Sequence, residues 1–514
     1  MSKTIIIIGA GLAGLSAALQ AAENGCNVKL VSSLPSERAQ SVMAEGGINA
    51  ALNTKDENDS PEEHFTDTIK AACGLADPNA VWEMTQAAPE LVHWLLKLGV
   101  KFNMSGYDDV DLRNFGGQKK KRTAFAQSDT GKQIMTAMID AVRRKEASGM
   151  VERFSHHSFL TLRLCGNSCC GCVIRDEYSQ ETVELPGDAV IVATGGMHGL
   201  FGNTTGSLSN TGEVTAELFR LGVPLANGEM IQYHPTTVKC GGKRMLISEA
   251  ARGEGGRLFA MKDGKQWYFM EEKYPELGNL MPRDITAREI WKVSHESEVF
   301  LDMTEISEEI ISNKLSGLAD DCMTYLHKDI RKEPVSVLPG IHYFMGGILV
   351  DEQHRTPIQN LCAAGECCAQ YHGANRLGGN SLLGALYGGR VAAKSACEQA
   401  DVVDLSCATQ IDFPPASQIS EIKQLNKVMQ ETMGVVRNEN TLLNGIQTVQ
   451  ALTGNLPLLG MAVLKSALAR KESRGAHWRE DYPKSNDNDY LKTTVARFDG
   501  KQIQISFVPV PERR

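Results

Sequence analysis

Three glycines near the start of the chain have the spacing G-x-G-x-x-G, in the run Gly9-Ala10-Gly11-Leu12-Ala13-Gly14. In this pattern the first glycine makes a tight turn, the second lets the backbone approach a pyrophosphate, and the third lets a helix pack on a strand. The apolar run Ile5–Ile8 before it is typical of a buried strand, and Leu15–Glu23 after it is typical of a helix. Free N–H groups at the start of that helix would hold a phosphate. We therefore predict a dinucleotide site at Gly9, Gly11 and Gly14.

The next predicted strand, Val28–Val31, completes a βαβ unit and ends in Ser32-Ser33. A site for NAD usually carries an acidic residue here to hold a ribose hydroxyl, and this chain has none. Another strand, Ala189–Ala193, leads into Thr194-Gly195-Gly196, and Glu366 lies in a further glycine-rich turn. Glu366 could hold a ribose if FAD lies extended across the domain, so the pattern favours FAD over NAD.

These elements predict an α/β fold class with a discontinuous, Rossmann-like dinucleotide domain made of residues 1–220 and 342–402. A separate domain would be inserted at 221–341. Residues 415–514 would form a C-terminal helical domain and tail, after a linker at 403–417 that contains Pro414 and Pro415. Helical periodicity is expected over Ser381–Ala400, Ile419–Met433 and Leu458–Ser473, and a strand pair over 491–514.

The composition narrows the class of function. Hydrophobic residues make up 42% of the 514 residues and charged residues 22%, as in a soluble globular protein of two or three domains. The net charge is −9 and no basic face or arm stands out, so we expect no nucleic-acid partner. No apolar stretch is long enough to span a bilayer. The odd count of 13 scattered cysteines favours free thiols in a reducing compartment.

Four of these cysteines, Cys165, Cys169, Cys170 and Cys172, fall within eight residues and raise the question of a metal site. Their spacing suits one poorly, because the segment reads as two strands joined by Gly166-Asn167-Ser168. Adjacent residues of a strand point to opposite faces, so Cys169 and Cys170 should diverge. We expect free thiols on a hairpin and no metal.

A series of motifs follows the glycine-rich turn in a fixed order: Ala44-Glu45-Gly46-Gly47, Phe115-Gly116-Gly117, Gln232-Tyr233-His234-Pro235-Thr236, Arg252-Gly253-Glu254-Gly255-Gly256, Pro282-Arg283-Asp284, the runs 342–347 and 372–378, and the run 470–477. In this ordered set the chain resembles the flavoprotein subunits of fumarate reductase and succinate dehydrogenase, and their near relative L-aspartate oxidase. The resemblance covers nearly the whole chain. It implies an FAD-binding domain, an inserted capping domain of α+β type and a C-terminal helical domain, with boundaries that agree with those above.

The resemblance also implies which residues hold FAD. Besides the three glycines and Ser32, they are Ala44, Gly46, Gly47, Thr194, Gly195, Glu366, Ser381 and Leu382. The N–H groups of Ser381 and Leu382 open a helix and could stabilise negative charge on the reduced flavin. A histidine usually carries the flavin covalently in this family, and Gln40 stands at that place. An amide cannot form that bond, so we expect non-covalent FAD.

The same resemblance places His234, His342 and Arg376 on the carboxylates of fumarate or succinate, with Ser248 as a hydroxyl contact. A guanidinium fork and two imidazoles suit a dianion. Arg283 is the implied proton donor. Because a free arginine has a pKa above about 12, it needs a relay that reloads it, and Glu249 and Arg252 stand at the relay positions.

Two rival functions remain open. L-Aspartate oxidase uses a glutamate at the position of Phe115 to hold the substrate ammonium, and a phenyl ring cannot do so. A flavin-carrying scaffold without turnover is the other, although every catalytic position is filled. Because a histidyl link raises the flavin potential and is missing here, we expect fumarate reduction rather than succinate oxidation.

The electron donor must lie outside this chain, since no convincing cluster or haem motif is present. The resemblance implies a separate iron–sulfur subunit and a cytoplasmic location, peripheral on the inner face of a membrane if partner subunits provide an anchor. A quinone-linked complex and a soluble thiol- or ferredoxin-linked complex are both compatible with the sequence.

Overall fold

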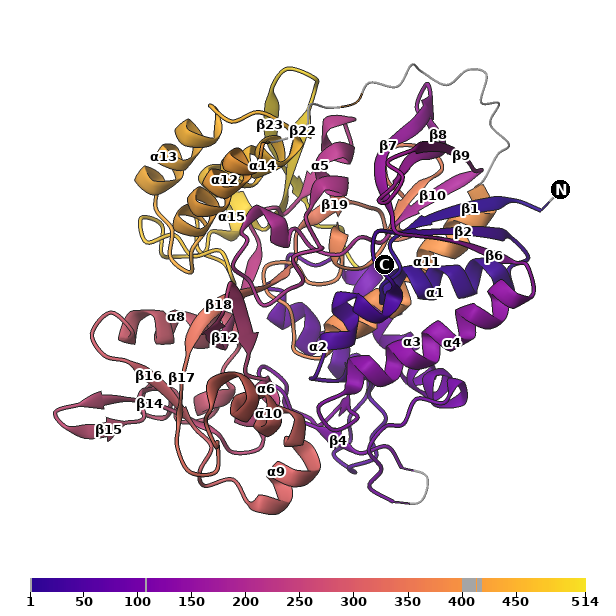
Figure 1. Cartoon of the computed structure of the whole chain (residues 1–514). Coiled ribbons are helices and arrows are strands. Elements are labelled where there is room, and N and C mark those ends of the chain that lie inside the picture. The colour runs from indigo at the N-terminus through magenta and orange to yellow at the C-terminus, as the bar shows by residue number, and fades with distance from the viewer. Residues whose placement is uncertain (1, 107–108, 400–412, 414–417) are drawn as a thin grey trace.

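The computed structural model describes residues 2–106, 109–399, 413 and 418–514. Its central element is a five-stranded sheet in the order β20-β10-β1-β2-β6, with every neighbouring pair parallel (Figure 1). The strands are β1 (Thr4–Ile8), β2 (Asn27–Ser32), β6 (Val151–Ser155), β10 (Ala189–Val192) and β20 (Leu361–Ala363). A strand from the second half of the chain thus completes the sheet, and the predicted discontinuous Rossmann-like fold class is confirmed.

Alternate residues of β1 face two different layers, because successive side chains of a strand point to opposite sides. Ile5 and Ile7 pack with helices α1 (Leu12–Glu23), α4 (Thr130–Ala147) and α11 (Asn380–Gln399). Ile6 and Ile8 pack on the other side with a three-stranded antiparallel layer. In Figure 1, α1 and α11 lie below the sheet and β7, β8 and β9 above it.

That antiparallel layer consists of β7 (His157–Cys165), β8 (Ser168–Asp176) and β9 (Thr182–Pro186), so the predicted cysteine hairpin is confirmed. Cys169, Cys170 and Cys172 are buried free thiols. Cys165 is disulfide-bonded. The prediction of free thiols is therefore wrong for Cys165.

Two sheets and several helices lie apart from the central sheet, at the lower left of Figure 1. The first sheet has β12 (Ile231–Cys240), β13 (Lys243–Leu246) and β18 (Leu338–Phe344); the second has β14 (Arg257–Lys262), β15 (Lys265–Trp267), β16 (Val299–Asp302) and β17 (Val335–Ser336). Their helices are α6 (Glu249–Gly253), α7 (Phe269–Lys273), α8 (Arg283–Val293), α9 (Glu308–Lys314) and α10 (Ser316–Asp321). This mixed α and β content suits the expected capping domain, whose boundaries stay a prediction.

The C-terminal part packs helices α12 (Ile419–Thr432), α13 (Glu439–Val449) and α14 (Asn455–Ala469) around one apolar cluster. The predicted helix Leu458–Ser473 is wrong at its end, because α14 stops at Ala469 and the chain then turns among buried charges. The predicted strand pair is confirmed as β22 (Lys492–Phe498) and β23 (Ile503–Pro509). Most of the predicted linker lies outside the described residues.

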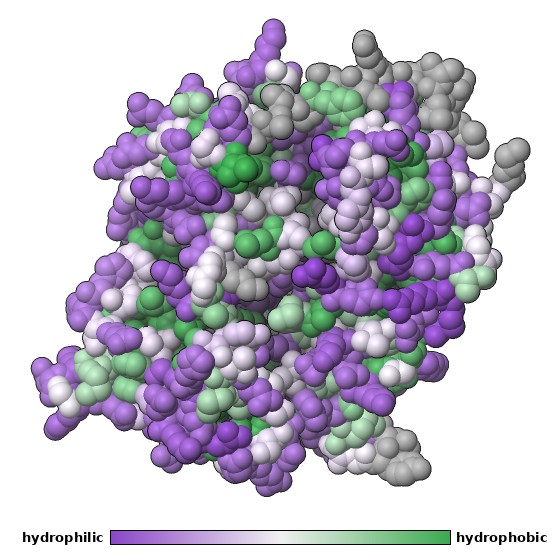
Figure 2. Space-filling view, viewed as in Figure 1, coloured by the Kyte–Doolittle hydropathy of each residue, from purple (hydrophilic) through white to green (hydrophobic). Residues whose placement is uncertain are grey.

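The other regular elements are α2 (Pro61–Ala71), α3 (Pro78–Leu98), α5 (Glu213–Arg220), α15 (Asp487–Tyr490), β3 (Ile48–Asn49), β4 (Leu112–Arg113), β5 (Thr123–Ala124), β11 (Leu225–Ala226), β19 (Gly347–Leu349) and β21 (Cys368–Ala369). None of the described helices has both the length and the apolar run needed to cross a bilayer. On the face shown in Figure 2, hydrophobic side chains are interspersed with hydrophilic ones.

Candidate active site

One cavity of about 1420 Å³ runs from the ends of β1, β2 and β10 to the residues of the inserted segment. It gathers nearly all the predicted site residues. Those predicted to hold FAD are Gly9, Gly11, Ser32, Ala44, Gly46, Gly47, Thr194, Gly195, Glu366, Ser381 and Leu382. Those predicted for substrate and proton transfer are Phe115, His234, Ser248, Glu249, Arg283, His342 and Arg376. Gly14 and Arg252 do not line the cavity; they lie directly behind residues that do.

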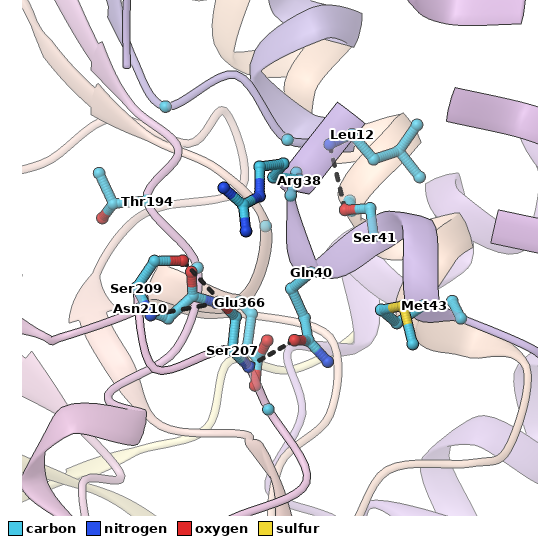
Figure 3. A pocket seen from close by; sticks show the side chains of 18 of the residues that line it. Leu12, Arg38, Gln40, Ser41, Met43, Thr194, Ser207, Ser209, Asn210 and Glu366 are labelled. Carbon is cyan, nitrogen blue, oxygen red and sulfur yellow. Dashed lines mark hydrogen bonds between the residues drawn. The ribbon is translucent and has the colours of Figure 1, made fainter. Parts of the chain in front are cut away.

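The glycine-rich turn has the close approaches that its spacing predicts. Gly9 has φ +112°, and a Cβ there would lie 2.2 Å from the Ala193 carbonyl oxygen. A Cβ at Gly14 would lie 1.8 Å from the Gly9 carbonyl oxygen, so only glycine lets α1 pack this near β1. The Leu12 N–H donates to the Ser41 hydroxyl at 3.2 Å (Figure 3). The glycine-rich turn is thus held against the segment that carries Gln40.

Polar groups along the cavity fit an extended dinucleotide. The Ser32 hydroxyl at the end of β2 is buried and has no hydrogen-bond partner among the described residues. Glu366 accepts from the Phe344 N–H at 3.1 Å, and its Oε1 lies 3.6 Å from His198 Nε2. The unpartnered Ser32 hydroxyl and the Glu366 carboxylate, together with the glycine cradle, suit FAD.

Gln40 lies at the wall of the same cavity. Its side-chain oxygen accepts a hydrogen bond from the Ser207 N–H at 2.5 Å (Figure 3). The amide is therefore tied to the 205–211 loop, whose residues also line the cavity.

His234 on β12 and His342 on β18 meet across paired strands, with ring centroids 5.1 Å apart. The Thr205 hydroxyl lies 2.8 Å from His342 Nδ1, and His234 Nε2 is buried without a partner among the described residues. Burial, and then the charge of Arg283, lowers the pKa of both imidazoles well below the usual range. Both rings are therefore neutral at neutral pH and offer hydrogen bonds rather than charge.

Arg376 supplies a cation at the same place. Its guanidinium carbon lies 4.3 Å from the centre of the Tyr343 ring, and its Nε has no partner among the described residues. Burial, followed by repulsion from Arg283, lowers the pKa of Arg376 to about 9. The group therefore stays charged at neutral pH, although it forms no ion pair with a carboxylate among the described residues. A dianion would supply the missing partner.

Arg283 begins α8 and is joined to a chain of buried groups. Its Nε and Nη2 donate to Glu249 Oε2 at 2.9 and 2.6 Å, and its Nη1 donates to Gln232 Oε1 at 3.0 Å. Arg252 Nη2 donates to the other oxygen of Glu249 at 3.3 Å. Burial raises the pKa of Glu249, but Arg283 and Arg252 outweigh it and hold the pKa below its usual value. The carboxylate thus stays ionised between two guanidinium groups.

Three further residues at the site were not predicted. Gln232 is fully buried and joins Arg283 to the Arg376 backbone, since its amide nitrogen donates to the Arg376 carbonyl oxygen at 2.9 Å. It precedes His234 by two residues on β12, so strand alternation was a usable signal. Thr205 lies in a loop whose sequence carries no motif that would predict its contact with His342. Glu45 lies in the run Ala44-Glu45-Gly46-Gly47. Burial, followed by the charge of Asp321, raises its pKa to about 8.

Comparison with known proteins agrees with this arrangement. Residues 4–382 match the family described as FAD binding domain, and residues 452–513 match the family described as fumarate reductase flavoprotein C-term. The chain is 38% identical to the succinate dehydrogenase flavoprotein subunit of Bacillus subtilis, over 100% of this chain and 98% of that protein. It is 32% identical to the 8-methylmenaquinol:fumarate reductase flavoprotein subunit of Wolinella succinogenes, over 100% of this chain and 92% of that protein.

The fold gives the same result. The solved structure of E. coli quinol fumarate reductase superposes with a TM-score of 0.90 at 27% identity, over 99% of this chain and 97% of that one. The FAD-type cavity, the two matched families and the similarity over full length lead to one conclusion. The chain belongs to the succinate dehydrogenase and fumarate reductase flavoprotein family and is an FAD-dependent oxidoreductase.

Proposed function

We propose that this chain interconverts fumarate and succinate, with fumarate reduction as the favoured direction. One observation carries the proposal: Arg283, paired with Glu249, lines the same cavity as His234, His342 and Arg376. A cavity with two cations and two neutral imidazoles suits a small dicarboxylate. The names of the relatives, a succinate dehydrogenase and a fumarate reductase, support the same substrate pair.

In the proposed clamp, Arg376 pairs with one carboxylate while His234 and His342 donate to the dianion. The Ser248 hydroxyl adds a contact, and the Phe115 ring closes the cavity beside Gly46. Because the imidazoles are neutral and desolvated, their hydrogen bonds act in a medium of low dielectric, where they are stronger than in water. Phe115 offers no group for an ammonium, which disfavours L-aspartate as a substrate.

When bound and reduced by its external electron donor, the flavin would supply the hydride through N5. In our proposal Arg283, which lines the cavity, gives a proton to the other carbon of the double bond. Arg252 then passes a proton through the Glu249 carboxylate back to Arg283 along the hydrogen bonds between them, and a proton from solvent reloads Arg252. Gln232 holds the remaining edge of the Arg283 guanidinium and so fixes its orientation.

We also propose that FAD is bound without a covalent link, because Gln40 replaces the linking histidine. Its carboxamide has no nucleophilic ring nitrogen, and its oxygen accepts a hydrogen bond from the Ser207 N–H. A flavin without a histidyl substituent has a lower potential, and this favours electron flow toward fumarate.

Electrons would come from a separate iron–sulfur subunit near Met43 and Leu208, which line the cavity and are 65% and 54% exposed. Partner subunits would hold the complex at the inner face of the membrane, with this chain in the cytoplasm.

The test uses the purified, FAD-loaded chain with reduced benzyl viologen as donor. We expect fumarate-dependent oxidation of the dye and formation of succinate, and no iminoaspartate from L-aspartate. Acid precipitation should leave all the flavin in the supernatant. A chain that holds FAD but leaves fumarate unchanged would overturn the proposed reaction, and flavin that stays with the pellet would overturn the non-covalent link.

A further inference from the structure

A short turn outside the cavity touches both elements that carry the two key arginines. This turn is the run Arg474–Trp478, called here the 474–478 turn. We propose that it is a positioning element, which sets the spacing between the guanidinium groups of Arg283 and Arg376. The proposal rests on the proposed reaction, in which those groups act on one substrate molecule.

The turn has a rigid base. Arg470 pairs with Glu229 at 2.7 Å and with Glu472 at 2.8 Å, and all three side chains are fully buried. Arg474 Nε donates to the same Glu472 oxygen at 2.8 Å. The turn is closed on itself, since the Arg474 N–H donates to the His477 carbonyl oxygen at 2.8 Å. Breaking a buried ion pair is costly, so this base can hold other elements in place.

One side of the turn holds the loop that presents Arg376. The Ala476 N–H donates to the Ala374 carbonyl oxygen at 2.9 Å, and the Ala374 N–H donates to the Ala72 carbonyl oxygen at 3.0 Å. Gly475 has φ +54°, and a Cβ there would lie 2.6 Å from the Ala374 carbonyl oxygen. Ala374 precedes Arg376 by two residues. The close approach therefore fixes the loop just before the clamp residue.

The other side of the turn holds the helix that presents Arg283. The Arg288 guanidinium lies over the Trp478 ring, 4.0 Å from its centre. Arg288 is on α8, which begins at Arg283, so a shift of Arg288 moves the start of a stiff helix. The loop and the helix also meet directly, because Asn375 Nδ2 donates to Asp284 Oδ1 at 3.0 Å. Turn, loop and helix thus form a closed triangle.

This closed triangle of turn, loop and helix, called here the frame, would keep two repelling guanidinium groups at a fixed spacing. Arg283 and Arg376 are both buried cations that line one cavity, and repulsion from Arg283 contributes to the lowered pKa of Arg376. Without the substrate dianion the two groups would tend to move apart. A frame that holds them in place spares the reaction this reorganisation, and a displacement of about 1 Å can cost 10²-fold in rate.

The two sides of the turn predict different kinetic effects, measured with reduced benzyl viologen and fumarate. Trp478→Ala and Arg288→Ala release α8, so kcat should fall about tenfold with little change in KM. The double variant should be no slower than either single variant, because both remove one contact. Trp478→Phe keeps an aromatic ring and should restore most of kcat. Gly475→Ala shifts the loop of Arg376, so it should chiefly raise KM and weaken fumarate binding in calorimetry.

The matched control is the pair of Arg257 and Tyr268, which make the same kind of contact at 3.7 Å elsewhere in the inserted segment. Tyr268→Ala should keep wild-type kcat. FAD content and melting temperature are measured for every variant. Arg288 is only half-buried, so Arg288→Ala carries the test if Trp478→Ala does not fold.

Three results would overturn the inference: wild-type kcat in Arg288→Ala, additive losses in the double variant, or an equal loss in Tyr268→Ala. An inactive wild-type chain would instead count against the proposed reaction. The two failures are therefore distinguishable, since the positioning role is judged only against an active wild type.

Discussion

At the scale of single residues, Arg283 is the proposed proton donor. Arg283→Gln removes the guanidinium that faces the cavity and leaves Glu249 paired with Arg252. Since a positioned general acid contributes about 10²- to 10⁴-fold, we expect fumarate reduction to fall by at least that factor while FAD remains bound. Flavin absorbance and viologen oxidation measure the two quantities. Arg257→Gln, at a partly exposed pair with Glu271, is the control and should stay active. Wild-type turnover in Arg283→Gln would remove Arg283 from the reaction.

A second prediction concerns how the KM for fumarate depends on pH through Glu45. Burial, followed by Asp321, raises its pKa to about 8, while the nearby charge of Arg113 lowers it. Below pH 8 the carboxyl is therefore neutral, and above pH 8 it adds a negative charge to a cavity proposed for a dianion. We expect KM for fumarate to rise as the pH passes through 8. Glu45→Gln should flatten this rise, measured as KM between pH 6.5 and 9.5. A KM that rises equally in both proteins would assign the titration to another group.

At the scale of elements, the contact between β1 and α1 is tested by Gly14. A Cβ at Gly14 would lie 1.8 Å from the Gly9 carbonyl oxygen, which is backbone and cannot move aside. Gly14→Ala should therefore lose FAD and lower the melting temperature. Gly242→Ala is the matched control, because a Cβ there meets nothing within 4 Å. Retention of full FAD content by Gly14→Ala would contradict this close packing.

The elements also show which parts of the fold could be predicted from local sequence patterns. The apolar run of β1 and the glycines after it were predictable because local sterics dictate them. Helix α13 was missed, since Gly445 in its interior weakens the helical signal. The structure gives the reason for that glycine: a Cβ there would lie 2.5 Å from Thr432 of α12. Likewise, no local pattern places Thr205 beside His342, because that contact joins segments brought together only by the fold.

At the scale of the whole molecule, one buried ion network ties the C-terminal part to the rest of the chain. Arg470 pairs with Glu229 and Glu472, and it donates to the carbonyl oxygen of Lys492 at 2.7 Å and to the hydroxyl of Thr494 at 2.7 Å. These partners come from three separate segments. Removing Arg470 leaves the buried carboxylate of Glu229 without its cation, while Glu472 keeps Arg474, and an unpaired buried charge costs more than the pair itself contributes.

Arg470→Ala should therefore lower the free energy of unfolding by about 3–5 kcal/mol. Urea denaturation followed by circular dichroism measures this change. Arg355→Ala, which removes a partly exposed pair with Asp351, is the control and should change stability little. Because Glu472 also holds Arg474 at the base of the 474–478 turn, Arg470→Ala should loosen the frame of the active site as well. Fumarate reduction should then fail at a lower urea concentration than global unfolding, whereas coincident curves would separate the network from the site.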